Sequence, residues 1–152
     1  MNNIGTYVKS VLIPLVLGGI VGFIISGVMD YDTLTKPFLA PPGIVFPIVW
    51  TTLYLLMGVS YGILKTKGLT DEKVNQVYYL QLVINALWSI FFFSLEWSLF
   101  SFFWIIALII AVIAMIREFY ARDKASGLLQ IPYLIWLLFA AYLNLAIYLL
   151  NR

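Results

Sequence analysis

The 152-residue chain is 63% apolar and only 11% charged, with a net charge of +2 and a mean hydropathy of +1.00. Soluble domains are about half apolar and about a quarter charged, so this composition excludes an ordinary soluble core. Cysteine and histidine are both absent, which excludes disulfides, zinc sites built on Cys and His, and a Ser-His-Asp triad. We therefore expect no metal and no resident cofactor, and the small net charge does not indicate a nucleic-acid partner.

Five charge-free windows predict five transmembrane helices. They cover residues 10–29, 43–64, 75–95, 98–116 and 128–150. Each is about as long as the roughly 20 apolar residues that one bilayer crossing needs. Helices are expected because a backbone surrounded by lipid must form its own hydrogen bonds. The sequence thus predicts an all-α integral membrane protein, a five-transmembrane-helix bundle that forms a single domain over residues 1–152.

Charge asymmetry between the loops predicts the orientation of this bundle. Five spans place the termini on opposite sides, and the positive-inside rule assigns the more cationic side to the cytoplasm. The N-terminus is then cytoplasmic and the C-terminus external, and we expect a bacterial cell membrane. One side carries seven cations and the other side two: Lys9, Lys65, Lys67, Lys73, Arg117, Arg122 and Lys124 against Lys36 and Arg152.

The interior of the spans contains no Asp, Glu, Lys or Arg. Ion and proton pathways through membranes usually require such residues, so their absence argues against a proton-coupled pump or an ion channel. It also removes the usual candidates for general acid–base catalysis. We expect any ligand to be bound by shape, aromatic contact and neutral hydrogen bonds.

Three spans carry polar or aromatic side chains on one helical face. The amides on the third span either join helices to one another or face a ligand, and the sequence leaves both interpretations open. The faces consist of Trp50, Tyr54, Met57 and Tyr61 on the second span, Tyr78, Gln81, Asn85, Trp88 and Phe92 on the third, and Trp136, Ala140 and Asn144 on the fifth.

Two stripes of small residues and one loop complete the pattern. Small residues let helices approach closely, either within the bundle or across a homodimer. The stripes are Gly18, Gly22 and Ser26 on the first span and Ala107, Ala111 and Ala114 on the fourth.

The loop over residues 30–42 contains Tyr31, Phe38 and Leu39, which either dip into the lipid interface or cap a cavity at the outer mouth.

Four blocks of sequence resemble a known family. They are LTKPFLAPP at residues 34–42, VWTTLYLLMG at 49–58, LQLVINALWSIFF at 80–92 and PYLIWLLFAAYLN at 132–144. In this order they are similar to the TspO/MBR family, the tryptophan-rich sensory proteins and translocator proteins. The resemblance implies a five-helix fold with a lid loop between the first two helices. It also implies binding of porphyrins such as protoporphyrin IX and, in some members, of sterols and benzodiazepine-site drugs.

The resemblance implies a ligand site to which the lid and three spans contribute. Lys36 is the only cation in the lid loop, so we expect it to lie near the propionates of a porphyrin. The other implied ligand-binding residues are Tyr31, Phe46, Trp50, Tyr54, Asn85, Trp88, Ser89, Trp136, Ala140 and Leu143.

Three functions remain open at this point. The first is a membrane receptor or carrier for porphyrins and related hydrophobic ligands, acting in tetrapyrrole homeostasis or stress sensing. The second is a light-dependent porphyrin-degrading enzyme in which Trp50 and Trp136 take part in the photo-oxidation. The third is a dimeric membrane scaffold or regulator, or a sterol-binding transporter, for which Leu145, Tyr148 and Arg152 offer a formal motif match.

Overall fold

The computed structural model describes residues 3–26, 34–95 and 97–152, and its regular elements there are all helical. Five helical segments are long and apolar enough to cross a membrane, which confirms the predicted five-helix membrane bundle. The elements are α1 (Asn3–Ser26), α2 (Val45–Thr66), α3 (Glu72–Ser89), the π-helical turn η2 (Ile90–Ser94), α4 (Ser98–Arg122), the short α5 (Lys124–Leu128) and α6 (Ile131–Asn151).

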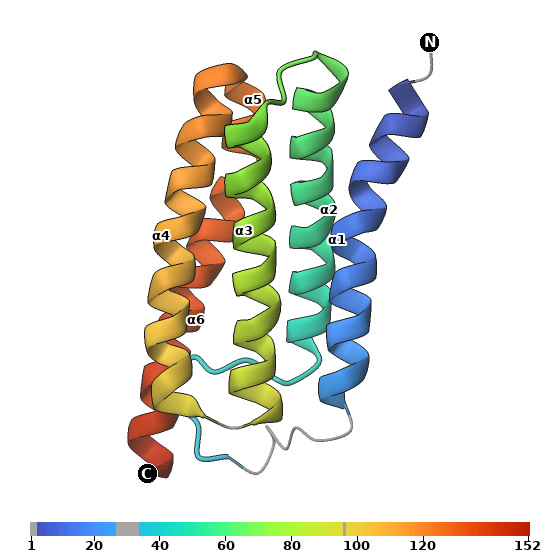
Figure 1. The fold of residues 1–152 in the computed structure, drawn as a ribbon. Coiled ribbons are helices and arrows are strands. Elements are labelled where there is room, and N and C mark those ends of the chain that lie inside the picture. The colour runs from blue at the N-terminus through green and yellow to red at the C-terminus, as the bar shows by residue number, and fades with distance from the viewer. Residues whose placement is uncertain (1–2, 27–33, 96) are drawn as a thin grey trace.

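The long helices run side by side with alternating direction (Figure 1). The N-terminus, the α2–α3 connection and α5 lie together at one end of the bundle, which we call the N-terminal end (Figure 1). The C-terminus and the described part of the first loop lie at the opposite, C-terminal end. The backbones of α1 and α2, of α3 and α4, and of α4 and α6 come closest to one another.

The helices extend beyond the charge-free windows at several ends. Helix α1 begins at Asn3 rather than at residue 10, and α4 continues to Arg122 rather than ending at residue 116. Polar residues at these ends lie where water is available, so the helix continues past the apolar segment. Asp123 separates α4 from the short α5, which it caps by accepting a hydrogen bond from the Ser126 N–H at 3.0 Å. Helix α6 then begins at Ile131.

Glycines allow the close packing of α1 against α2. A Cβ atom at Gly58 would overlap the backbone of Val11, and one at Gly18 would overlap the ring of Tyr54. Gly18 therefore packs within the bundle, whereas Gly22 faces open space. The side chain of Ser26, the third member of the predicted stripe, lies outside the described residues.

Ion pairs hold together the loops at the N-terminal end. Lys67 after α2 contacts the Asp123 carboxylate at 2.5 Å, and Arg122 contacts Asp71 and Glu118 at 2.8 Å each. The hydrogen bond from Lys67 lowers the pKa of Asp123 below its ordinary value. The hydrogen bond from Arg122 does the same to the pKa of Asp71. These pairs fasten the α2–α3 connection to the α4–α5 junction.

We predict that Gly58→Ala destabilises the bundle. Alanine is intrinsically better than glycine in a helix by about 1 kcal/mol. At Gly58 the added methyl group meets backbone, which cannot rotate away, so we expect a net loss of roughly 1–3 kcal/mol from overpacking. Thermal unfolding in detergent, followed by circular dichroism, measures the change.

Gly19→Ala is the matched control, because a Cβ atom there has nothing within 4 Å. It should leave the melting temperature unchanged or raise it. If the two variants melt together, the close α1–α2 packing described here is incorrect.

Candidate ligand-binding site

An aromatic cluster fills the space between α2, the α3–η2 segment and α6. The ring of Trp50 lies 5.6 Å from Tyr54, 6.2 Å from Trp88 and 6.3 Å from Tyr133, measured between ring centroids. Phe46 extends the cluster to Trp136 at 6.0 Å. We call this set the aromatic cluster; its members are Phe46, Trp50, Tyr54, Trp88, Phe92, Phe93, Tyr133 and Trp136.

Two indole N–H groups in the aromatic cluster are buried without a hydrogen-bond partner among the described residues. They belong to Trp50 and Trp136, the two tryptophans that the sequence singled out as candidates for ligand contact and photochemistry. An unpaired buried donor costs roughly 1–3 kcal/mol. The cluster therefore offers two donors to a ligand that brings acceptor atoms.

A chain of hydrogen bonds runs beside these rings and connects three helices. The Tyr54 hydroxyl donates to Asn85 Oδ1 at 2.6 Å, and Asn85 Nδ2 donates to the Tyr133 hydroxyl at 2.7 Å. Tyr133 in turn donates to Gln81 Oε1 at 2.8 Å, and Gln81 Nε2 points to the Met57 sulfur at 3.8 Å. Of the two interpretations left open for the amides, the structure favours contacts between helices. Asn85 uses both ends of its amide within the protein.

A second hydrogen-bonded link joins α3, α4 and α6. The indole N–H of Trp88 donates to Asn144 Oδ1 at 3.0 Å, and Asn144 Nδ2 donates to the carbonyl of Ser98 at 2.7 Å. Trp88 is thus a member of the aromatic cluster whose polar atom is already used. Its ring is buried, and Phe92 stacks on it at 5.3 Å.

The end of the third span is a π-helical turn that the sequence did not predict. In η2 the Leu95 N–H donates to the Ile90 carbonyl at 3.0 Å, five residues earlier. The wider turn places Phe93 edge-on to Trp88 at 5.8 Å while Phe92 also contacts it, so two consecutive residues are buried on the same side. Phe93 then contacts Phe46 at 5.6 Å.

The described part of the first loop, residues 34–42, which we call the lid segment, is fastened to α6. Asn151 accepts a hydrogen bond from the Thr35 N–H at 2.9 Å and donates to its carbonyl at 2.8 Å. The Tyr142 hydroxyl donates to the Phe38 carbonyl at 2.6 Å. Lys36 is half-buried and its Nζ lies 3.4 Å from the Leu34 carbonyl. The predicted lid contact Tyr31 lies outside the described residues.

The remaining predicted site residues are buried in the helices around the cluster. Ser89 lies on α3, and Ala140 and Leu143 lie on α6. Sequence reasoning missed Tyr133 and Phe93. Tyr133 precedes Ala140 by seven residues on the same helical face, a spacing that could have identified it. No comparable signal marks Phe93, because a π-turn changes the register.

A separate surface pocket of about 290 Å³ lies between the start of α4 and the end of α6. It contains none of the residues that the resemblance implies for porphyrin binding, although Tyr148 and Arg152 of the sterol motif line it. Its lining consists of Trp97, Ser98, Leu99, Phe100, Tyr148, Asn151 and Arg152.

Comparisons with known proteins agree with the four sequence blocks. The profile described as the TspO/MBR family matches residues 10–150. The chain is 43% identical to the tryptophan-rich protein TspO of Archaeoglobus fulgidus, over 98% of this chain and 99% of that protein. It is 35% identical to the protein CrtK of Rhodobacter capsulatus, over 88% and 85%. It is 32% identical to the human translocator protein, over 81% and 75%.

We predict that Tyr133→Phe destabilises the bundle. Without the hydroxyl, Asn85 Nδ2 loses its acceptor and Gln81 Oε1 loses its donor, and both atoms remain buried. Each unsatisfied group costs roughly 1–3 kcal/mol, so the melting temperature in detergent should fall clearly. Tyr120→Phe is the matched control, since Tyr120 is exposed. Equal melting temperatures for the two variants would contradict the proposed role of the chain of hydrogen bonds.

Proposed function

Because the chain belongs to the TspO/MBR family, we propose that it is a membrane receptor or carrier that binds porphyrins in the aromatic cluster. The five apolar helices and the family make it an integral membrane protein, and the family supports a receptor or sensor role. Protoporphyrin IX and related flat hydrophobic molecules are the ligands that we propose for it. The unpaired indole N–H groups of Trp50 and Trp136 are the observation that carries this proposal.

The chemistry of the cluster suits a flat, aromatic ligand with a few acceptor atoms. Ring contacts between aromatic groups add about 0.5–1.5 kcal/mol each beyond the area they bury. The indole donors would pair with the propionate oxygens or another acceptor of the ligand. The packing of α2 also suits porphyrin binding. The backbone of α2 approaches α3 and α6 at few points, and large aromatic rings fill the space between these helices.

The lid segment lies next to this site. Leu34 and Ala40 pack against the buried core near the start of α2. Lys36 lies in the same segment, and we propose it as the cation nearest to a bound propionate. The tethers from Asn151 and Tyr142 in α6 hold the segment in place from one side.

We predict that Trp50→Phe and Trp136→Phe each weaken porphyrin binding. Phenylalanine keeps most of the apolar area but lacks the N–H, and one hydrogen bond contributes about 0.5–1.5 kcal/mol. The expected loss is therefore about 2- to 10-fold in affinity for each variant. Titration of detergent-solubilised protein with protoporphyrin IX in the dark, followed by fluorescence, measures it.

Trp97→Phe provides the control, because Trp97 is exposed and lies outside the aromatic cluster. If both cluster variants bind porphyrin like the wild type, the proposed binding site is wrong.

Illumination of the same samples tests the enzymatic alternative. That alternative requires bound porphyrin to be consumed faster than porphyrin in empty detergent, and a slower loss in the Trp50 variant.

The proposed orientation places the N-terminal end of the bundle in the cytoplasm. In the structure, the seven cations counted in the sequence belong to segments at this one end (Figure 1). A reporter enzyme that is active only outside the cytoplasm should therefore be active when fused after Arg152 and inactive when inserted at Gly68. The reverse pattern would contradict the orientation and leave the fold intact.

A further inference from the structure

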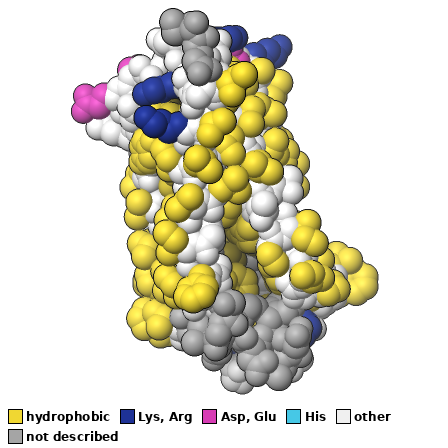
Figure 2. All heavy atoms as spheres, turned by 90° about the vertical axis from the view of Figure 1, so that its right-hand side faces the viewer, with side chains coloured by type: hydrophobic (Ala, Val, Ile, Leu, Met, Phe, Trp, Pro, Cys, Tyr) yellow, Lys and Arg dark blue, Asp and Glu magenta, His cyan; other side chains and the backbone are white. Residues whose placement is uncertain are grey.

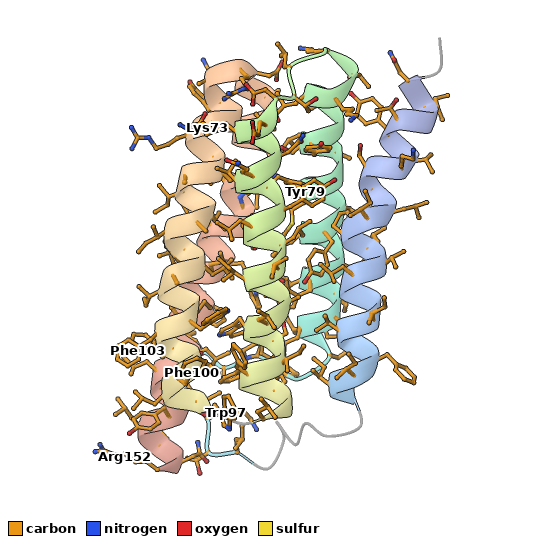
Figure 3. All side chains as sticks on the ribbon, viewed as in Figure 1. Lys73, Tyr79, Trp97, Phe100, Phe103 and Arg152 are labelled. Carbon is orange, nitrogen blue, oxygen red and sulfur yellow. The ribbon has the colours of Figure 1, made fainter. Side chains whose placement is uncertain are left out.

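Helix α4 presents a stripe of exposed apolar residues that ends in a cation. Phe103, Ile110 and Arg117 are spaced by seven residues and lie on one helical face. Phe103 is 62% exposed and Ile110 is 65% exposed, and Ile106 and Ile113 between them are also exposed. Because α4 is long and apolar enough to span a membrane, this exposed stripe is open either to lipid or to a second copy of the chain. Figure 3 shows Phe103 pointing away from the bundle.

Helix α1 carries a similar stripe on another side of the bundle. Lys9, Val16 and Phe23 share one face at the same spacing, and Ile13 and Ile20 fill the positions between them. All five are exposed, and Phe23 reaches 84%. Helices α1 and α4 lie at opposite edges of the bundle (Figure 1), and both stripes end in their cation near the N-terminal end.

The position of Arg117 along α4 places it at a membrane interface. Trp97 and Arg117 are twenty residues apart, which corresponds to about 30 Å along a helix. The hydrocarbon core of a bilayer is also about 30 Å thick, and tryptophans often lie at its boundary. With Trp97 at one boundary, Arg117 reaches the other boundary, where the phosphates begin. Figure 2 shows dark blue side chains directly above an apolar band on the α1 side.

The ion pairs of this end leave the two cations unpaired. Lys67, Lys73 and Arg122 pair with the carboxylates of the loops and of α4. Lys9 and Arg117 form no ion pair with any residue in the described ranges. Among the described residues, Lys9 and Arg117 are thus cations without an ion pair on the helix faces that carry the two apolar stripes.

We propose that Lys9 and Arg117 each bind the phosphate of an anionic phospholipid in the leaflet at the N-terminal end. An Arg guanidinium can bind a phosphate through two parallel hydrogen bonds. A Lys side chain can lay its alkyl stem along the apolar stripe and extend its ammonium to the headgroups. The acyl chains then lie along the exposed residues of the same stripe.

A second copy of the chain is the less favourable occupant of these faces. Parallel copies related by a two-fold axis normal to the membrane would bring one Arg117 towards the other if α4 packed on α4. Like charges in such an interface repel each other. The same argument applies to Lys9 on α1. A lipid phosphate supplies the opposite charge instead.

The test is the selectivity of the protein surface for spin-labelled phosphatidylglycerol over spin-labelled phosphatidylcholine in a reconstituted bilayer. Electron paramagnetic resonance separates the motionally restricted lipid at the protein from the free lipid. Each cation near an anionic headgroup should contribute about fivefold at low salt. The double variant Lys9→Gln with Arg117→Gln should therefore lose several-fold of the wild-type selectivity at low ionic strength.

The matched control is Lys67→Gln with Lys73→Gln, which removes the same charge from ion-paired positions. It should keep the wild-type selectivity. The proposal is overturned if the Lys9 and Arg117 variant keeps full selectivity, or if the control loses as much. It is also overturned if lipid is excluded from α4 regardless of headgroup in a dimer, because a second copy would then occupy the face. Circular dichroism confirms that each variant remains helical.

Discussion

The membrane interior offers no water to a polar side chain, so a hydrogen-bond partner within the bundle is the main requirement for a buried amide or hydroxyl. The chain from Tyr54 through Asn85 and Tyr133 to Gln81 meets this requirement and joins α2, α3 and α6. Helix–helix contacts in lipid lack the hydrophobic driving force of soluble cores, so such bonds and close packing decide the arrangement. The positions of the aromatic rings follow from this constraint.

Helix α2 is held in two different ways on its two sides. On the α1 side, Gly58 lets the backbones touch, which leaves no room for a ligand. On the other side, rings such as Trp50 separate α2 from α3 and α6. Rings that contact one another can rotate or part at less cost than backbones that interlock, because side-chain torsions change without breaking helical hydrogen bonds. A flat molecule would therefore enter on the aromatic side of α2.

Residue patterns predicted the five helices and their order because each span must be apolar over the thickness of a bilayer. They predicted helix ends less well, since nothing in a charge-free window tells where a helix such as α4 stops outside the lipid. Among site residues, the pattern identified Asn85 as inward-facing, but its partner Tyr133 lies on another helix, and pairing across helices is not encoded in one helix's periodicity. Phe93 could not be predicted because η2 shifts the register.

The tryptophans show how the chain separates structural indoles from available ones. Trp88 donates to Asn144, and Trp104 donates to the Ile84 carbonyl at 2.9 Å, so these indole donors are paired within the protein. Trp50 and Trp136 lie in the same interior and are not paired in this way. The Asn and carbonyl acceptors nearby serve the neighbouring helices, and each unpaired donor costs the folded protein roughly 1–3 kcal/mol. In the proposed function, a ligand acceptor would pair donors that have already lost their water. Binding would then recover energy that the folded protein gave up, which is the physical reason to look for the ligand between these two indoles.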